Sequence, residues 1–136
     1  MNERWHRLAR NRAPRTALVA RIVAGAVFVL FGLAKFVRHE HGVAEFVRFG
    51  FADPSLLVYV VGTLEVVGGA MLLAGLAVRT FAALLAADMA GAVATAGPTV
   101  GGPIHLGLAP ALLLTMLFLV WAGGGRSRRA LRADAG

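Results

Sequence analysis

Four long apolar stretches constrain the fold of this chain more than any other feature of its sequence. Each holds at most one or two ionisable residues and approaches the ~20 residues that a helix needs to cross ~30 Å of hydrocarbon. Backbone groups in lipid must be paired within their own segment, so the stretches are predicted to be helices that pack against one another. They cover residues 17–37, 55–78, 80–96 and 104–122. The sequence therefore predicts an all-α protein, an integral membrane four-helix bundle.

The composition favours one membrane domain with short polar ends. Of 136 residues, 58% are hydrophobic, and the mean hydropathy of +0.72 is too high for a soluble fold of this size. We expect a basic cytoplasmic or interfacial segment at residues 1–16, the four-helix domain at 17–122 and a basic cytoplasmic tail at 123–136.

The basic residues are distributed unevenly across the predicted membrane. By the positive-inside rule the side richer in Lys and Arg is the cytoplasm, and an even number of spans places both termini there. We therefore expect a multi-pass protein of the cell inner (plasma) membrane. Because the arginines adjoin the ends of apolar spans, anionic lipid headgroups account for them and no nucleic-acid partner is expected. The arginines on this side are Arg4, Arg7, Arg10, Arg12, Arg15, Arg21, Arg79, Arg126, Arg128, Arg129 and Arg132.

Residues 38–54, between spans one and two, differ in character from the spans. Apolar and charged residues alternate there in an amphipathic pattern, which predicts a short interfacial helix of one or two turns on the outer membrane surface. Asp53 is expected to be the N-cap of span two and Pro54 its first helical residue.

Cysteine and histidine bear on redox and metal chemistry. The chain has no cysteine, which excludes disulfides, thiolate metal sites and thiol exchange performed by this chain. His39, His41 and His105 lie on the outer side but form no recognised metal-binding pattern, so no metal site is expected. Any redox role would require a bound cofactor or a partner.

Glu65 is the ionisable residue placed deepest in the apolar spans. It lies about 15 Å along the helix axis from the start of span two, near mid-membrane. An acidic residue there costs about 2.5–3.5 kcal/mol, so it must be protonated, paired or in contact with water or a ligand. Lys35, near the outer end of span one, either pairs with Glu65 or extends outward to the membrane surface.

Asp88 is a second buried acid, about 12 Å into span three. Its candidate partners are Arg21, Arg79 and the hydroxyl group of Thr63 or Thr95. Hydrogen bonding that only supports helix packing and a proton or ligand role both remain open for it.

Short motifs follow one another along the spans: Gly25, Phe28, Gly32 and Lys35-Phe36, then Phe46 to Gly50, then Glu65, Gly68-Gly69, Gly75, Arg79 and Asp88-Met89. This succession resembles the DoxX family of small four-span bacterial membrane proteins. The resemblance covers most of residues 17–129 and implies a four-helix membrane bundle. The family is named from a subunit linked to a quinol-oxidising complex, and other members are associated with oxidoreductase partners. By this likeness Lys35, Glu65 and Arg79 occupy the family's characteristic polar positions.

The leading functional hypothesis is an accessory or quinone-interacting subunit of a membrane oxidoreductase system. The alternatives are a non-catalytic assembly module that binds a partner protein or a second copy of the chain, and a small-solute or proton carrier. An autonomous enzyme is less favoured than any of these. No catalytic residue is assigned, and a quinone is the candidate cofactor. The candidates for ligand binding or proton relay are Lys35, Glu65, Asp88, His105 and Arg79.

A quinone-like ligand would require a narrow apolar cavity with a few convergent polar groups, which we expect to open toward the outer leaflet. Gly62 lies one turn outward from Glu65, where the missing side chain is expected to leave space. The candidate lining residues are Phe28, Phe36, Phe46, Gly62 and Gly69.

Overall fold

The computed structural model describes residues 13–99 and 102–123, and these residues contain helices and no strand. The predicted basic segments before residue 13 and after residue 123 lie outside the described residues. The helices are α2 (Pro14–Val37), α3 (His39–Arg48), α4 (Ser55–Ala74), α5 (Val78–Thr99) and α6 (Ala109–Ala122), with a π-helical segment η1 (Ile104–Leu108) before α6.

The helix lengths fit a membrane protein. Three helices are long and apolar enough to cross a bilayer, at Pro14–Val37, Ser55–Ala74 and Val78–Ala96. A fourth apolar helix, Leu106–Ala122, is shorter. The predicted all-α membrane bundle is thus confirmed, with a fourth helix that is shorter than the other three.

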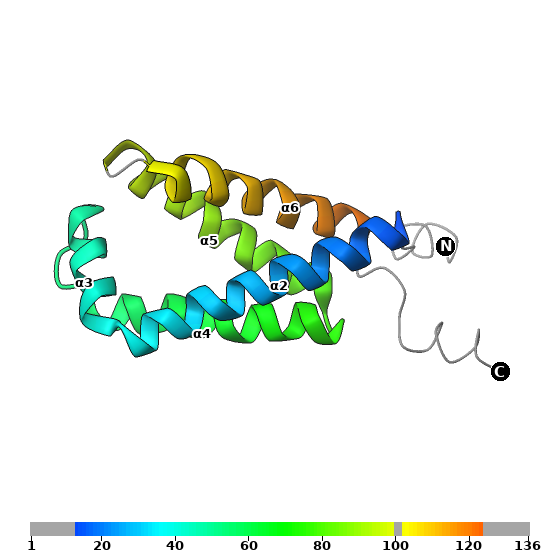
Figure 1. The fold of residues 1–136 in the computed structure, drawn as a ribbon, viewed down its shortest axis with the longest axis horizontal. Helices are drawn as coiled ribbons and strands as arrows, with labels where there is room; N and C mark the ends of the chain where they lie inside the picture. The colour runs from blue at the N-terminus through cyan, green and yellow to red at the C-terminus, as the bar shows by residue number, and fades with distance from the viewer. Residues whose placement is uncertain (1–12, 100–101, 124–136) are drawn as a thin grey trace, which may run out of the picture.

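The four long helices are arranged as two antiparallel pairs (Figure 1). Helix α2 packs along α4, α5 packs along α6, and contacts of α4 with α5 and of α2 with α6 join the pairs. The start of α2 and the end of α6 lie at one end of the bundle, here called the terminal end. The pairs diverge toward the opposite end, where α3 packs on the end of α2 and the start of α4; this is here called the α3 end.

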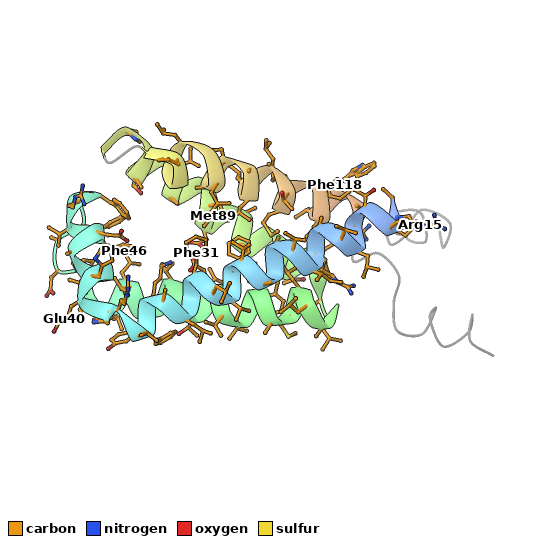
Figure 2. All side chains as sticks on the ribbon, in the orientation of Figure 1. Arg15, Phe31, Glu40, Phe46, Met89 and Phe118 are labelled. Carbon is orange, nitrogen blue, oxygen red and sulfur yellow. The ribbon has the colours of Figure 1, made fainter. Side chains whose placement is uncertain are left out.

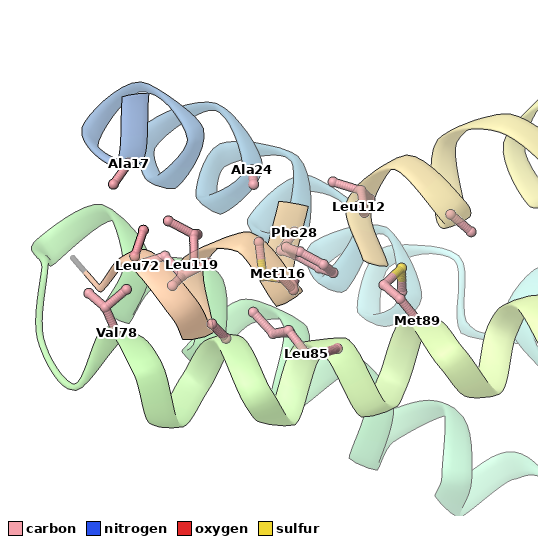
Figure 3. Close-up of a cluster of buried hydrophobic side chains, with 14 residues drawn as sticks. Ala17, Ala24, Phe28, Leu72, Val78, Leu85, Met89, Leu112, Met116 and Leu119 are labelled. Atoms are coloured by element: carbon pink, nitrogen blue, oxygen red, sulfur yellow. The ribbon is translucent and has the colours of Figure 1, made fainter. Parts of the chain in front are cut away.

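The apolar core is concentrated toward the terminal end of the bundle. Figure 3 shows Phe28 of α2, Leu85 of α5 and Met116 of α6 gathered between the helices. All three side chains are fully buried, as is Leu72 near the end of α4. In a bilayer the lipid tails are as apolar as these side chains, so the core is stabilised by van der Waals packing and not by removal from water. This packed core fixes how the two pairs sit relative to each other.

Helix α3 confirms the predicted amphipathic helix but is longer than one or two turns, with 10 residues. Its Gly42 lies against α4, since a Cβ there would be 3.0 Å from a methyl group of Val58. Figure 2 shows Glu40 at the outer edge of the molecule and Phe46 on the side of α3 that faces the other helices. The polar and apolar residues of this segment therefore lie on different sides of the helix.

The start of α4 differs from the prediction. Helix α4 begins at Ser55 with Pro54 as its N-cap, because the Pro54 carbonyl accepts the first helical hydrogen bond, from the Val58 N–H at 2.9 Å. Asp53 is not the cap and has a left-handed backbone, with φ of 46°.

The fourth span is not one regular α-helix. It begins with the five-residue π-helical segment η1, and α6 follows with Pro110 in its first turn. Proline has no N–H to donate and its ring displaces the carbonyl four residues earlier. A wider π-type turn just before Pro110 accommodates the missing hydrogen bond and the displaced carbonyl.

Candidate functional site

Helices α2 and α4 touch through their backbones at two pairs of glycines. A Cβ on Gly32 would lie 2.7 Å from the Gly62 carbonyl oxygen, and a Cβ on Gly69 would lie 2.6 Å from the Gly25 carbonyl oxygen. Both distances are shorter than any side chain tolerates, so only glycine permits this approach. The expectation that Gly62 leaves space for a ligand is not met, because α2 occupies that space. Gly69 likewise lies in the helix contact and lines no cavity there.

The glycine contact fixes the positions of Lys35 and Glu65. Lys35 lies one turn beyond Gly32 toward the α3 end, and Glu65 lies one turn beyond Gly62 toward the terminal end, because the helices are antiparallel. A Cβ on Gly62 would lie 3.1 Å from the Lys35 Cβ, so Lys35 is level with Gly62 and only about 4.5 Å from Glu65 along the axis. Helical side chains lean toward the N-terminus of their own helix. In an antiparallel pair this makes Lys35 and Glu65 lean toward each other.

Lys35 and Glu65 form a buried ion pair. The Lys35 Nζ donates to the Glu65 Oε2 at 2.7 Å, and the two side chains are 19% and 4% exposed. The alternative in which Lys35 extends outward to the membrane surface is therefore excluded for this structure. Charge-assisted hydrogen bonds of this length are roughly twice as strong as neutral ones.

Asp88 of α5 joins the pair from a third helix. Gly68 of α4 packs on the Leu85 side chain, where a Cβ would lie 3.0 Å from a Leu85 methyl carbon. One turn farther toward the α3 end, the antiparallel hairpin brings Glu65 and Asp88 to the same level. At this level the two acids lie close enough for their charges to interact, and Asp88 also interacts with the charge of Lys35. We call Lys35, Glu65 and Asp88 the charged cluster.

The partners expected for Asp88 are corrected by the structure. The hydroxyl of Thr63 donates to the Tyr59 carbonyl oxygen at 2.8 Å, and that of Thr95 donates to the Gly91 carbonyl oxygen at 2.7 Å. Each hydroxyl thus bonds to its own helix one turn back. Within the described residues, the Asp88 Oδ2 is buried and has no hydrogen-bond partner.

The two arginines considered as partners of Asp88 lie at the terminal end instead. Arg79 Nε donates to the Val120 carbonyl oxygen at 3.1 Å, at the end of α6. The buried Arg21 guanidinium lies beside Gly75, the C-cap of α4, where a Cβ would be 2.7 Å from Arg21 Nη1. Positive charge at the C-terminus of a helix is stabilising. Arg79 therefore belongs to a helix-end contact and not to the charged cluster.

The predicted aromatic lining residues are separated in the structure. Phe28 is fully buried in the apolar core. The Phe36 ring tilts against Tyr59 with centroids 5.7 Å apart, and the Phe46 ring lies 5.4 Å from that of Phe49. His105 lies in η1, and its side chain is outside the part that the structure describes.

Sequence reasoning missed the contact that joins α3 to α4. The His39 ring stacks on the Tyr59 ring at 3.9 Å with an interplanar angle of 12°. Its Nε2 lies 3.0 Å from the Ser55 carbonyl oxygen, which only accepts, so Nε2 carries the hydrogen. Nothing in the sequence pairs a loop histidine with a tyrosine in the next span, so no sequence signal identifies this contact.

The other described features of the α3 end are an exposed ion pair and an open hollow. Among the described residues, no group of three or more His, Cys, Asp or Glu side chains is placed to hold a metal ion. His41 instead pairs with Glu45 at 3.3 Å, one turn along α3. An open hollow of about 550 Å³ lies at the junction of α2 and α3, and residues 36–41 line it. It is separate from the charged cluster.

Comparison with known protein families identifies the family of this chain. Residues 16–98, which include the whole charged cluster, match the DoxX family. The chain belongs to the DoxX family. An uncharacterized membrane protein of Mycobacterium tuberculosis, Rv3486, is 31% identical over 136 aligned residues, which cover 90% of this chain and 83% of that protein.

A second relative carries a functional name. The Bacillus subtilis protein named "Putative oxidoreductase CatD" is 35% identical over 78 residues, which cover 57% of each chain. No solved structure matches this chain.

Proposed function

We propose that this DoxX protein is an accessory, quinone-interacting subunit of a membrane oxidoreductase system. The observation that carries the proposal is the charged cluster, in which three ionisable side chains from three apolar helices converge between the membrane spans. Ionisable residues within membrane spans are rare, and they mark ligand or ion pathways by default. Helix packing alone does not require such residues, because polar contacts between membrane helices average only about 0.6 kcal/mol.

The cluster offers both kinds of hydrogen-bonding group that a quinone headgroup needs. The Lys35 ammonium has three donors and uses one for Glu65 in this structure. A quinone carbonyl oxygen can accept one of the others. The Asp88 Oδ2 is an acceptor with no partner among the described residues, which suits the hydroxyl group of the reduced, quinol form. Lys35 is the more exposed member of its ion pair, so a ligand would approach from its side.

Two further points support the proposal without deciding it. One relative is named as an oxidoreductase. This chain has no cysteine, so an electron-transfer role would depend on a bound ligand or on a partner protein. The function also implies a plasma-membrane location, with both termini in the cytoplasm by the distribution of arginines.

Ligand-dependent thermal stability tests the proposal. The purified protein in mild detergent is heated with and without a short-chain ubiquinone analogue. A stabilising ligand raises the melting temperature according to its concentration relative to Kd. We expect a rise in the parent protein and a smaller rise in Glu65→Gln. Glu45→Gln, the same change at a carboxylate of α3 outside the cluster, should behave as the parent does.

Either of two outcomes would contradict the proposal. If the parent shows no shift, or if Glu65→Gln shows the same shift as the parent, the charged cluster does not bind quinone. A stoichiometric protein that co-purifies would then support the second candidate, a non-catalytic assembly module.

A further inference from the structure

We propose that the charged cluster binds one exchangeable proton, shared between the carboxyl groups of Glu65 and Asp88, and is electrically neutral at neutral pH. The inference concerns the cluster alone and does not depend on whether a quinone binds. It assigns a proton-binding site within the membrane-spanning part of the bundle.

The charge count is the first argument. Lys35 contributes one positive charge, and Glu65 and Asp88 contribute two negative charges when both are ionised. The fully ionised cluster therefore has a net charge of −1. A net charge between membrane helices is costly because no water compensates it, and one bound proton removes it.

The position of Asp88 is the second argument. Asp88 lies at the level of Glu65 on the neighbouring helix, and its Oδ2 is buried with no hydrogen-bond partner among the described residues. Two carboxyl groups that share such a site do not both ionise, because their like charges repel. One proton held between them removes the repulsion and leaves one carboxylate charge to balance the Lys35 ammonium, which lies 2.7 Å from Glu65.

No other charged group among the described residues compensates the net charge of −1 in place of the proton. Helix α6 has no ionisable side chain. Arg79 on α5 donates to carbonyl oxygens at the end of α6, and Arg21 on α2 lies beside Gly75, both at the terminal end. On α3, His41 pairs with Glu45 and His39 lies against the Ser55 carbonyl oxygen. Lys35 is thus the cation that faces the two acids from the described helices packed around them.

Infrared spectroscopy of the full chain in lipid nanodiscs tests the proposal, because the carbonyl stretch of a protonated carboxyl group is separate from the bands of carboxylates. At neutral pH we expect one such band in the parent protein. Asp88→Asn should abolish it, since the remaining Glu65 is ionised against Lys35. The amide that this substitution introduces has nearly the shape of the carboxyl group and carries no charge, so the variant should keep the fold, which its melting temperature checks.

Two more variants complete the test. Lys35→Met removes the positive charge, so the band should become stronger as a second proton is bound. Glu45→Gln, outside the cluster, should leave the band unchanged. A parent protein without the band at neutral pH would overturn the proposal. So would a band that persists unchanged in both Asp88→Asn and Glu65→Gln, because the proton would then reside elsewhere.

Discussion

Gly32 of α2 and Gly62 of α4 face each other with no room for a methyl group between the two helices. A Cβ on Gly32 would lie 2.7 Å from the Gly62 carbonyl oxygen and 2.7 Å from the Val66 nitrogen. Both obstacles are backbone atoms, which cannot rotate away as a side chain does. This contact sets the register that brings Lys35 to Glu65, so the glycines position the charged cluster without belonging to it.

The first prediction concerns this contact. Gly32→Ala should destabilise the protein by about 1–3 kcal/mol, the usual cost of inserting a carbon atom into a packed interface. The measurement is the melting temperature in detergent. Gly91→Ala is the matched control, because a Cβ at Gly91 on α5 meets no atom within 4 Å. Equal losses in the two variants would show that the α2–α4 contact is not tight.

The second prediction concerns the ion pair of the charged cluster. Removing one partner breaks a hydrogen bond between charged groups, so Lys35→Met and Glu65→Gln should each cost about 1.5–3 kcal/mol, whereas the double variant should cost less than their sum. Thermal or denaturant unfolding of the four proteins gives the coupling energy. Strictly additive losses would mean that the two side chains do not interact.

A third prediction concerns His39, whose ring stacks on Tyr59 and bonds to the Ser55 carbonyl oxygen. His39→Ala should cost about 1–3 kcal/mol, since an aromatic pair and a hydrogen bond each contribute roughly 0.5–1.5 kcal/mol. Proteolysis of the α2–α3 junction should accelerate as well. His41→Ala, two residues away on the same helix, removes only an exposed pair with Glu45 and should change stability by less than about 1 kcal/mol. The prediction fails if the two variants behave alike.

The fourth prediction is the topology. A reporter that fluoresces only in the cytoplasm should give signal when fused after Gly136, and a phosphatase that is active only outside should be active when fused after Asp53. The distribution of arginines is the reason. A stable but dark fusion after Gly136 would reverse the orientation.

The sequence is informative where a residue type conflicts with its surroundings. Charged residues in apolar stretches stand out, and Lys35 and Glu65 are identified as candidates on that basis alone. The register between helices is not visible in the same way. The partners predicted for Asp88 are wrong because its neighbours depend on how Gly68 packs on Leu85, which no single helix encodes.

The positions of glycine and proline are known from the sequence, but their effects on helix packing and backbone geometry are not. A glycine in a span indicates either empty space or close contact, and only the neighbouring helix decides between them; Gly62 proves to be a contact. Pro110 is evident within the fourth span, yet the π-helical segment before it follows from backbone geometry that residue patterns do not specify.

The place of Lys35 near the end of α2 also bears on biosynthesis. Thirty residues separate Lys35 from Glu65 along the chain, so α2 leaves the ribosome and enters the bilayer before its counter-ion exists there. A lysine at the centre of α2 would oppose insertion, but two residues from the helix end its long stem reaches the aqueous boundary while α4 is still being made. Insertion of α4 brings Glu65 within reach of the ammonium, and the pair can then form. The same position thus permits both insertion of the nascent helix and later closure of the ion pair.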